Sequence, residues 1–228
     1  MTGRPTLAIV VPALDAATTL PATLAALADA CAAFDADLVV VDGGSHDETP
    51  EVARRAGARV IAAPRGRGVQ LAAGAAAAMG DWLLFVHADT VLEHGWHEVA
   101  RDFVATARAR AGWFRFALDD ASRAARRLER IVDWRCRTLA LPYGDQGLLL
   151  PRALYDAAGG YRPLPLMEDV DLVRRLGRRR LAALDARAVT SAARYRHDGY
   201  LRRGARNLAC FALWRLGVPT GVITRLYG

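Results

Sequence analysis

Aspartates stand just beyond three apolar segments in the first ninety residues, and their chemistry is that of cation and hydroxyl binding. They are Asp15, Asp42 and Asp89. An aspartate in such a place can bind a hard divalent cation, which can in turn hold phosphate oxygens. Each acid alone could equally cap a turn or the next helix. Three acids in equivalent positions favour a shared site, because strands of a core have no need of acids at their ends.

A histidine precedes the third of these acids. His87 and Asp89 are separated by one residue, so both side chains can face the same side of the chain. We expect Asp89 to be a metal ligand. His87 is a candidate second ligand, or a residue that orients a neighbour or packs.

Two glycine-containing loops could contact a phosphate-bearing ligand. Asp42 opens an Asp-Gly-Gly-Ser turn and could accept hydrogen bonds from a nucleobase or ribose, while Asp47 reads as the N-cap of the following helix. Residues 65–68 form a flexible basic loop in which Arg67 could contact phosphate beside a helix N-terminus, with Gln70 just inside that helix. The loop is no dinucleotide fingerprint, because the third glycine is missing.

Adjacent acids at Glu168 and Asp169 could supply a general base for an acceptor hydroxyl. The alternative is that they only complement the dipole of the helix that they open. With Asp171, the segment holds more acids than capping requires.

The last part of the chain is basic first and apolar afterwards. Arg194 opens a basic patch that extends to Arg206. Such a patch is usually a solvated helix face, but it could also neutralise a diphosphate or meet anionic lipid headgroups. In that last case we expect Phe211, Leu213 and Trp214 to enter the membrane interface.

Alternating strands and helices are expected to position the acids. Apolar strands are predicted at 7–11, 38–41, 59–62 and 82–86, with helices at 19–33, up to 55, and at 68–79. This order is typical of a parallel sheet with right-handed crossovers. In such sheets ligands bind beyond the carboxyl ends of the strands.

After residue 90 the alternation is less regular. Helices are predicted at 96–109 and 121–139, strands at 113–118 and 148–150, a loop at 163–167, and a helix from 168 into the arginine cluster at 174–180. We expect one domain over 1–228, with a first half at about 1–90 and a second half at about 91–228 that includes the basic and apolar tail.

Composition narrows the class of protein. The 228 residues are 53% hydrophobic, which excludes a wholly disordered chain, and no apolar run approaches the ~20 residues that span a bilayer. The amino terminus lacks a secretion signal pattern, so we expect a cytoplasmic protein. The net charge of +7 comes from arginine without any lysine, and the three distant cysteines are expected to be buried free thiols.

Taken together, these motifs resemble glycosyltransferase family 2, on the nucleotide-sugar-binding fold called GT-A. The similarity extends from about residue 9 to about residue 206. A bacterial subgroup is the most similar, through motifs that stand here at 66–70 (Gly-Arg-Gly-x-Gln), 87–90 (His-Ala-Asp-Thr), 144–147 (Gly-Asp-Gln-Gly) and 191–195 (Ser-Ala-x-Arg-aromatic). The resemblance implies an α/β fold of GT-A type, with a mostly parallel central sheet flanked by helices, a Rossmann-like nucleotide-binding half and an acceptor-side half.

The resemblance also implies a reaction and its residues. The reaction would be inverting transfer of a sugar from a nucleotide-diphosphate sugar, with Mg²⁺ or Mn²⁺ bridging the diphosphate. By this resemblance Asp15 and Asp42 would bind the nucleoside, and Asp89, with His87 beside it, would bind the metal. Further contacts with the donor would come from Arg67, Gln70 and Arg194, and contacts with the sugar and the acceptor from Asp145 and Gln146. Asp169 would be the catalytic base, supported by Glu168.

Three positions depart from the family pattern. Ala16 removes an expected nucleoside contact, Gly43 replaces the second acid of an Asp-Asp pair, and His87 replaces the first acid of Asp-x-Asp. The last two also occur in the subgroup, and together they leave Asp89 as the single firm metal ligand.

Other classes of protein fit the sequence less well. A sugar nucleotidyltransferase needs a glycine-rich basic loop after its first strand, which is missing here. A nucleic-acid-binding protein would use the arginines but would not need three acids at strand ends, so we expect no nucleic-acid partner. A non-catalytic nucleotide-sugar binder stays open, as does the acceptor, for which a lipid-linked molecule and peripheral membrane contact are candidates.

Overall fold

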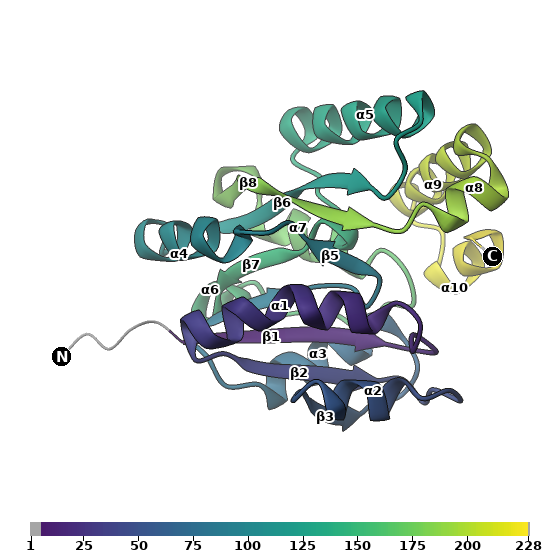
Figure 1. Ribbon diagram of the computed structural model, residues 1–228. Helices are drawn as coiled ribbons and strands as arrows, with labels where there is room; N and C mark the ends of the chain where they lie inside the picture. Colours follow the sequence, from purple (N-terminus) through teal and green to yellow (C-terminus); the bar gives the residue numbers. More distant parts are fainter. Residues whose placement is uncertain (1–5, 228) are drawn as a thin grey trace.

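The computed structural model describes residues 6–227 and has strands and helices in alternation over its first half (Figure 1). The prediction that the amino terminus carries no secretion signal concerns residues 1–5, which lie outside the described residues. The strands are β1 (Leu7–Ala13), β2 (Asp37–Asp42), β3 (Arg59–Ala62), β4 (Trp82–Phe85), β5 (Thr90–Leu92), β6 (Ala111–Leu118), β7 (Leu148–Pro151) and β8 (Leu181–Thr190). The helices are α1 (Leu20–Phe34), α2 (Thr49–Arg55), α3 (Arg67–Ala77), α4 (Trp96–Thr106), α5 (Arg123–Leu139), α6 (Arg152–Ala157), α7 (Glu168–Leu176), α8 (Ala193–Asp198), α9 (Tyr200–Arg215) and α10 (Thr220–Tyr227), with 3-10 turns η1 (Gly144–Gln146) and η2 (Arg178–Arg180).

Within the described residues the strands form one eight-stranded sheet in the order β3-β2-β1-β4-β7-β6-β8-β5. The β3-β2-β1-β4 part is parallel throughout, which confirms the expected α/β class. The β7 strand then pairs antiparallel with both β4 and β6, whereas β6 and β8 pair in parallel.

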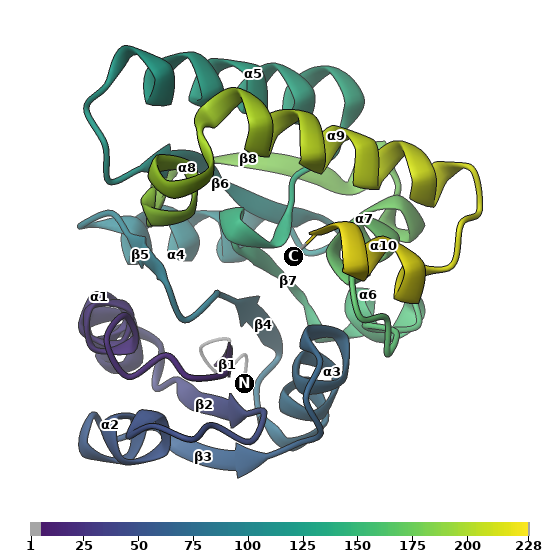
Figure 2. The same ribbon diagram turned by 90° about the vertical axis from the view of Figure 1, so that its right-hand side faces the viewer.

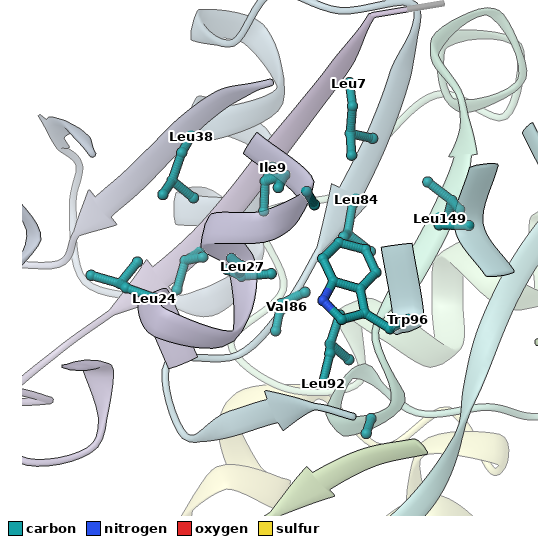
Figure 3. Packing of buried hydrophobic residues seen from close by; sticks show 14 of the residues in the cluster. Leu7, Ile9, Leu24, Leu27, Leu38, Leu84, Val86, Leu92, Trp96 and Leu149 are labelled. Atoms are coloured by element: carbon teal, nitrogen blue, oxygen red, sulfur yellow. The ribbon is translucent and has the colours of Figure 1, made fainter. Parts of the chain in front are cut away.

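Side chains from alternate positions of the central strands enter separate cores on the two faces of the sheet. On one face Ile9 and Leu84 pack beneath Leu27 of α1 and Trp96 of α4 (Figure 3). On the other face, the core includes Leu71 of α3. This alternation follows from the two-residue period of a strand and explains why strands covered on both faces are apolar throughout.

Two strands of the second half were not predicted. The β5 strand has three residues, and β8 contains four alanines and two charged residues, which are poor indicators of a strand. Its partner β6 determines its structure, since the two strands pair along their whole lengths with a register shift after Phe114. The helix predicted from residue 168 into the arginine cluster at 174–180 is present as α7 and ends inside that cluster at Leu176, where Gly177 takes a positive φ of 80°.

The carboxyl-terminal helices cover a third apolar cluster. Phe211, Leu213 and Trp214, for which a membrane interface was one alternative, are partly buried and pack against Leu166, Met167, Val170, Cys210 and Ile223. None of the helices within residues 6–227 combines the length and apolar character that crossing a membrane requires. The cysteines are free thiols, as expected; Cys136 and Cys210 are buried and Cys31 is partly buried.

Candidate active site at the carboxyl edge of the sheet

The carboxyl ends of β1, β2 and β4 lie together, and Figure 2 looks onto this edge, with α8, α9 and α10 on the same side of the molecule. The backbone N–H of Gly43 donates to the carbonyl of Ala13 (2.9 Å), and that of Val86 donates to the carbonyl of Val10 (3.1 Å). The loops that carry Asp15, Asp42 and Asp89 therefore leave the sheet from neighbouring strands.

The loop after β2 is held by its own aspartate. The Asp42 carboxylate accepts hydrogen bonds from the N–H groups of Gly44 and Ser45 and from the Ser45 hydroxyl (2.5 Å). The Asp15 carboxylate accepts from the N–H of His46 (2.8 Å), and the Asp15 N–H donates to Ser45 Oγ (2.9 Å). Turn capping is thus the observed role of Asp42. The nucleoside contacts of both acids stay predictions.

Asp47 differs slightly from its expected place. Glu48 occupies the N-cap position of α2, and it makes no side-chain capping bond. The Asp47 carboxylate nevertheless accepts from the N–H of Thr49, the first helical residue, and from the N–H of Ala17 (3.0 Å each). Asp47 therefore supports the helix start and ties the first two loops to each other.

Residues from the loop after β4, from η1 and from α7 meet around Gly144. Its N–H donates to Asp169 Oδ2 (2.6 Å). A Cβ atom on Gly144 would lie 2.7 Å from His87 Nε2 and 3.3 Å from Asp169 Oδ2. The predicted base and the predicted metal-site histidine therefore both border the position that a side chain at residue 144 would occupy.

Asp89 and Asp145 join the same group. The charges of Asp89 and Asp169 both act on the pKa of His87 and on that of Asp145. Two threonines hold the segments: Thr90 Oγ1 lies 2.8 Å from Thr190 Oγ1, which donates to the Asp145 carbonyl (3.5 Å). The structure thus brings together four of the predicted residues, from three separate parts of the chain: His87 and Asp89, Asp145, and Asp169.

More than half of the chain matches the sequence model of a known protein family. The sequence model of Glycosyl transferase family 2 matches residues 8–162. The chain belongs to this family. The match covers the parallel part of the sheet and the loops with Asp15, Asp42 and Asp89. It ends before Glu168 and Asp169, so the roles of those two residues rest on the geometry and on motif resemblance.

Solved structures share the fold of this glycosyltransferase. Glucosyl-3-phosphoglycerate synthase from Mycobacterium tuberculosis, in complex with Mn²⁺ and UDP-glucose, is 20% identical with a TM-score of 0.65, over 94% of this chain and 80% of that one. Another structure of that enzyme is 23% identical with a TM-score of 0.64, over 94% of this chain and 82% of the other. No curated protein sequence matches the chain significantly.

Arg67 and Glu168 form an ion pair deep in the site of the glycosyltransferase. Arg67 Nε lies 3.0 Å from Glu168 Oε1, and the Glu168 side chain is 1% exposed. Burial raises the pKa of Glu168 to about 7; Arg67 opposes the rise and the neighbouring Asp169 adds to it. The other oxygen, Oε2, is buried without a hydrogen-bond partner. Glu168 can therefore carry a proton at neutral pH.

His87 and Asp145 are also shifted. Burial, then the charge of Arg67, lowers the pKa of His87 to about 4, so its imidazole is neutral at pH 7 and can accept a hydrogen bond or bind a metal. Burial raises the pKa of Asp145 to about 6, against the effect of Arg135 and with repulsion from Asp169 and Asp89. Oδ1 of Asp145 is buried without a partner.

The other residues that were predicted to contact the donor or the acceptor are Gln70, Gln146 and Arg194. Gln70 Nε2 donates to the carbonyls of Ala13 (2.8 Å) and Val41 (2.9 Å), so its amide hydrogens join the ends of β1 and β2, and a donor contact would rest on its oxygen alone. Gln146 is 1% exposed and its side chain bonds Phe114, Tyr143 and Arg135; it supports the loop instead of lining the site.

Arg194 is exposed at the start of α8, near enough for its charge to lower the pKa of His87.

Half of the segment 65–68, predicted to be a basic loop, belongs to helix α3. Gly66 has a φ of 141°, and α3 begins at the next residue. A Cβ atom on Gly68 would lie 2.3 Å from the carbonyl oxygen of Arg162. The start of α3 is therefore packed directly against the loop that precedes α7, and this contact positions Arg67 beside Glu168.

Sequence reasoning missed the Thr90–Thr190 pair and the role of Gly144. Thr90 and Gly144 lie inside the motifs at 87–90 and 144–147, and these motifs were the only indication in the sequence that the two residues belong to the site. The backbone hydrogen bond of Gly144 has no such signal, because every residue but proline has an N–H group.

Proposed function

We propose that the protein transfers a sugar, with inversion, from a nucleotide-diphosphate sugar to a hydroxyl group, with Asp169 as general base. One observation carries the proposal: in a family 2 chain, Asp169 is fixed beside His87 at the carboxyl edge of the sheet, in the same group as Asp89 and Asp145. Ligands of open α/β sheets bind at that edge.

The chemistry requires one proton acceptor and one stabilised leaving group. The acceptor oxygen forms a bond to the anomeric carbon while Asp169 takes its proton. The bond between the anomeric carbon and the diphosphate oxygen breaks, and its electron pair leaves with the nucleoside diphosphate. Asp169 is oriented for this task by the N–H groups of Gly144 (2.6 Å) and Val170 (2.7 Å).

A divalent cation fits the residues of the site. Asp89, the neutral imidazole of His87 and the unpartnered Oδ1 of Asp145 are the oxygen and nitrogen atoms available to it. Within residues 6–227, no three His, Cys, Asp or Glu side chains are arranged to hold a metal by themselves. Mg²⁺ commonly takes one or two carboxylates together with substrate phosphates and water, so this set suits a metal bound with its donor.

The cation would neutralise charge on the departing diphosphate. Supporting examples come from the solved neighbours, which hold Mn²⁺ with UDP-glucose or Mg²⁺ with UDP.

The remaining donor contacts follow from position. We assign the nucleoside to the loops of Asp15 and Asp42, and the diphosphate to Arg67 and Arg194, whose charges both act on His87. Asp145 would face the sugar and the acceptor. The acceptor is a hydroxyl compound, lipid-linked ones included, and the proposed location is the cytoplasm or the inner face of its membrane.

Asp169→Asn tests the base. We expect the release of nucleoside diphosphate from the correct donor to fall by about 10²- to 10⁴-fold, because the amide cannot take the proton. Donor binding, measured by thermal shift with Mn²⁺ across UDP-, GDP-, ADP- and dTDP-sugars, should persist. Asp185→Asn is the matched control, since Asp185 is 89% exposed and pairs only at the surface with Arg115. Unchanged turnover in Asp169→Asn would contradict the assignment.

The same measurements distinguish a glycosyltransferase from the alternative function, a protein that binds a nucleotide sugar without reaction. A non-catalytic nucleotide-sugar binder would show the donor-dependent thermal shift without any release of nucleoside diphosphate from the wild-type protein.

A further inference from the structure

Exposed apolar side chains are concentrated on three helices. Within the described residues nine large apolar side chains are exposed, and eight of them belong to α5, α9 and α10 or to the residue that ends α9. They are Ile131, Trp134, Leu139, Leu201, Leu208, Leu216, Val222 and Leu226. The ninth, Met79, lies after α3. Single exposed apolar residues are ordinary, but such a concentration marks an interaction surface.

The exposed face of α9 is apolar along its whole length. Leu201, Ala205, Leu208, Ala212 and Leu216 recur every three or four residues and are exposed. The opposite face packs inward through Arg203 and Cys210, which are buried. A helix that only met water on its outer face would be polar there, so this face is built for a partner.

The charge of the same region is mainly positive. From residue 199 to residue 228 the chain holds five arginines and no acid. On α5, Arg123, Arg127 and Arg130 are exposed, and the one exposed acid, Asp133, is paired with Arg137 (2.8 Å). Arg178 Nη1 donates to the carbonyl of Thr138 (2.8 Å), which brings the arginines of η2 to the end of α5.

The helices form a continuous part of the molecule. Both views show α5 and α9 side by side over the β6–β8 end of the sheet, and α10 packs against α9 (Figures 1 and 2). We call the exposed apolar side chains and arginines of α5, α9 and α10 the apolar–basic surface.

We propose that the apolar–basic surface docks this protein peripherally on an anionic lipid bilayer. Leucine and tryptophan side chains enter the interfacial region of such a bilayer, while arginines meet its phosphates and the helices stay in the plane of the membrane. Nucleic acid would use the arginines but leave Leu201, Leu208 and Leu216 without a role. A protein partner does not require the absence of acids over the last thirty residues.

The surface is coupled to the site by packing. Cys210 of α9 and Ile223 of α10 contact Leu166, Met167 and Val170, the residues around the base Asp169. Docking through the outer face of these helices therefore leaves only one layer of helices between the bilayer and the segment that carries the base. This arrangement suits an acceptor that resides in the membrane, although the docking itself does not depend on the proposed reaction.

Vesicle flotation of the full-length protein, without donor or metal, tests the proposal. We expect binding to vesicles of equal parts phosphatidylglycerol and phosphatidylcholine, and at least about tenfold weaker binding to pure phosphatidylcholine vesicles. The double variant Leu201→Glu, Leu208→Glu should lose at least about tenfold in binding. Met79→Glu is the matched control, because it puts a glutamate at an equally exposed apolar position (77%) outside the surface. Circular dichroism verifies that each variant is folded.

Three outcomes overturn the proposal. One is that the wild type stays unbound to the phosphatidylglycerol vesicles, and another is that the double variant and Met79→Glu bind alike. The third is a wild-type dimer that dissociates in the double variant while no vesicles are bound, which makes the surface a contact between copies of the chain. Loss of sugar transfer in Asp169→Asn with vesicle binding unchanged keeps the two proposals separate.

Discussion

Gly144 has no side chain at a point where a Cβ atom would lie close to both His87 Nε2 and the carboxylate of Asp169. We expect Gly144→Ala to displace one of these side chains, since its Cβ atom would lie only 2.7 Å from the imidazole. The value of kcat/KM should fall by about tenfold or more, because small displacements at a reacting centre are costly. Gly204→Ala is the control: nothing lies within 4 Å of its Cβ position.

The control should keep full activity and gain up to about 1 kcal/mol of stability, as expected for glycine to alanine within a helix. Equal activity in the two variants would contradict the proposed contact.

The raised pKa of Glu168 predicts that the stability of the protein depends on pH. This pKa is raised by burial from 4.5 to about 7, so the folded protein favours the neutral carboxyl. This contribution to stability is complete below about pH 4.5 and is lost as the pH rises through about 7. Glu168→Gln cannot ionise. Its Tm relative to that of the wild type should therefore increase between about pH 5 and about pH 8, measured by thermal unfolding.

A relative Tm that falls over this range would mean that the ion pair with Arg67 outweighs burial.

Single residues were predictable where their chemistry depends on type and position in the chain. A shared site for Asp89 and Asp169 was expected from their places after a strand and at a helix start, whereas Asp145 was expected in it only through the resemblance to family 2. The positions of Gln70 and Gln146 did not, because an amide that binds a ligand and one that binds backbone carbonyls look alike in a sequence. Only the folded chain shows where their hydrogen bonds go.

Between elements, the contact of α3 with the loop before α7 sets the position of Arg67. A Cβ atom on Gly68 would lie 2.3 Å from a backbone oxygen of Arg162. We expect Gly68→Ala to push the two segments apart and to destabilise the protein by about 1–3 kcal/mol, as overpacking does. Denaturant unfolding measures the loss.

Gly221→Ala, at a helix position with open space around it, should show no such loss. A stable Gly68→Ala protein would show that the contact can relax.

Strands were predictable where a continuous apolar run indicated burial on both faces, and helices where apolar residues recurred with helical spacing. The four parallel strands of the first half were found within two residues at each end. The β8 strand was missed because alanine favours helices, and pairing with β6 overrides that preference. The antiparallel insertion of β7 between β4 and β6 depends on contacts between distant segments, which a local pattern does not contain.

For the whole molecule, we expect donor and metal to stabilise the fold together. At a concentration 100-fold above Kd, a ligand that binds only the folded state adds about 2.7 kcal/mol. The correct nucleotide-diphosphate sugar with Mn²⁺ should therefore raise the Tm, and removal of the metal with a chelator should reverse most of the shift. A shift of equal size without metal would contradict the role given to Asp89 and His87.

Two peptide N–H groups, those of Gly144 and Val170, hold the Asp169 carboxylate. Because peptide groups are common to nearly all amino acids, mutation of neighbouring side chains leaves these donors in place. If Asp169 is the base, as proposed, evolution can remodel the surrounding side chains that recognise an acceptor without disturbing this carboxylate. We then expect related chains to differ in their acceptors while they keep the same two backbone donors to the proposed base.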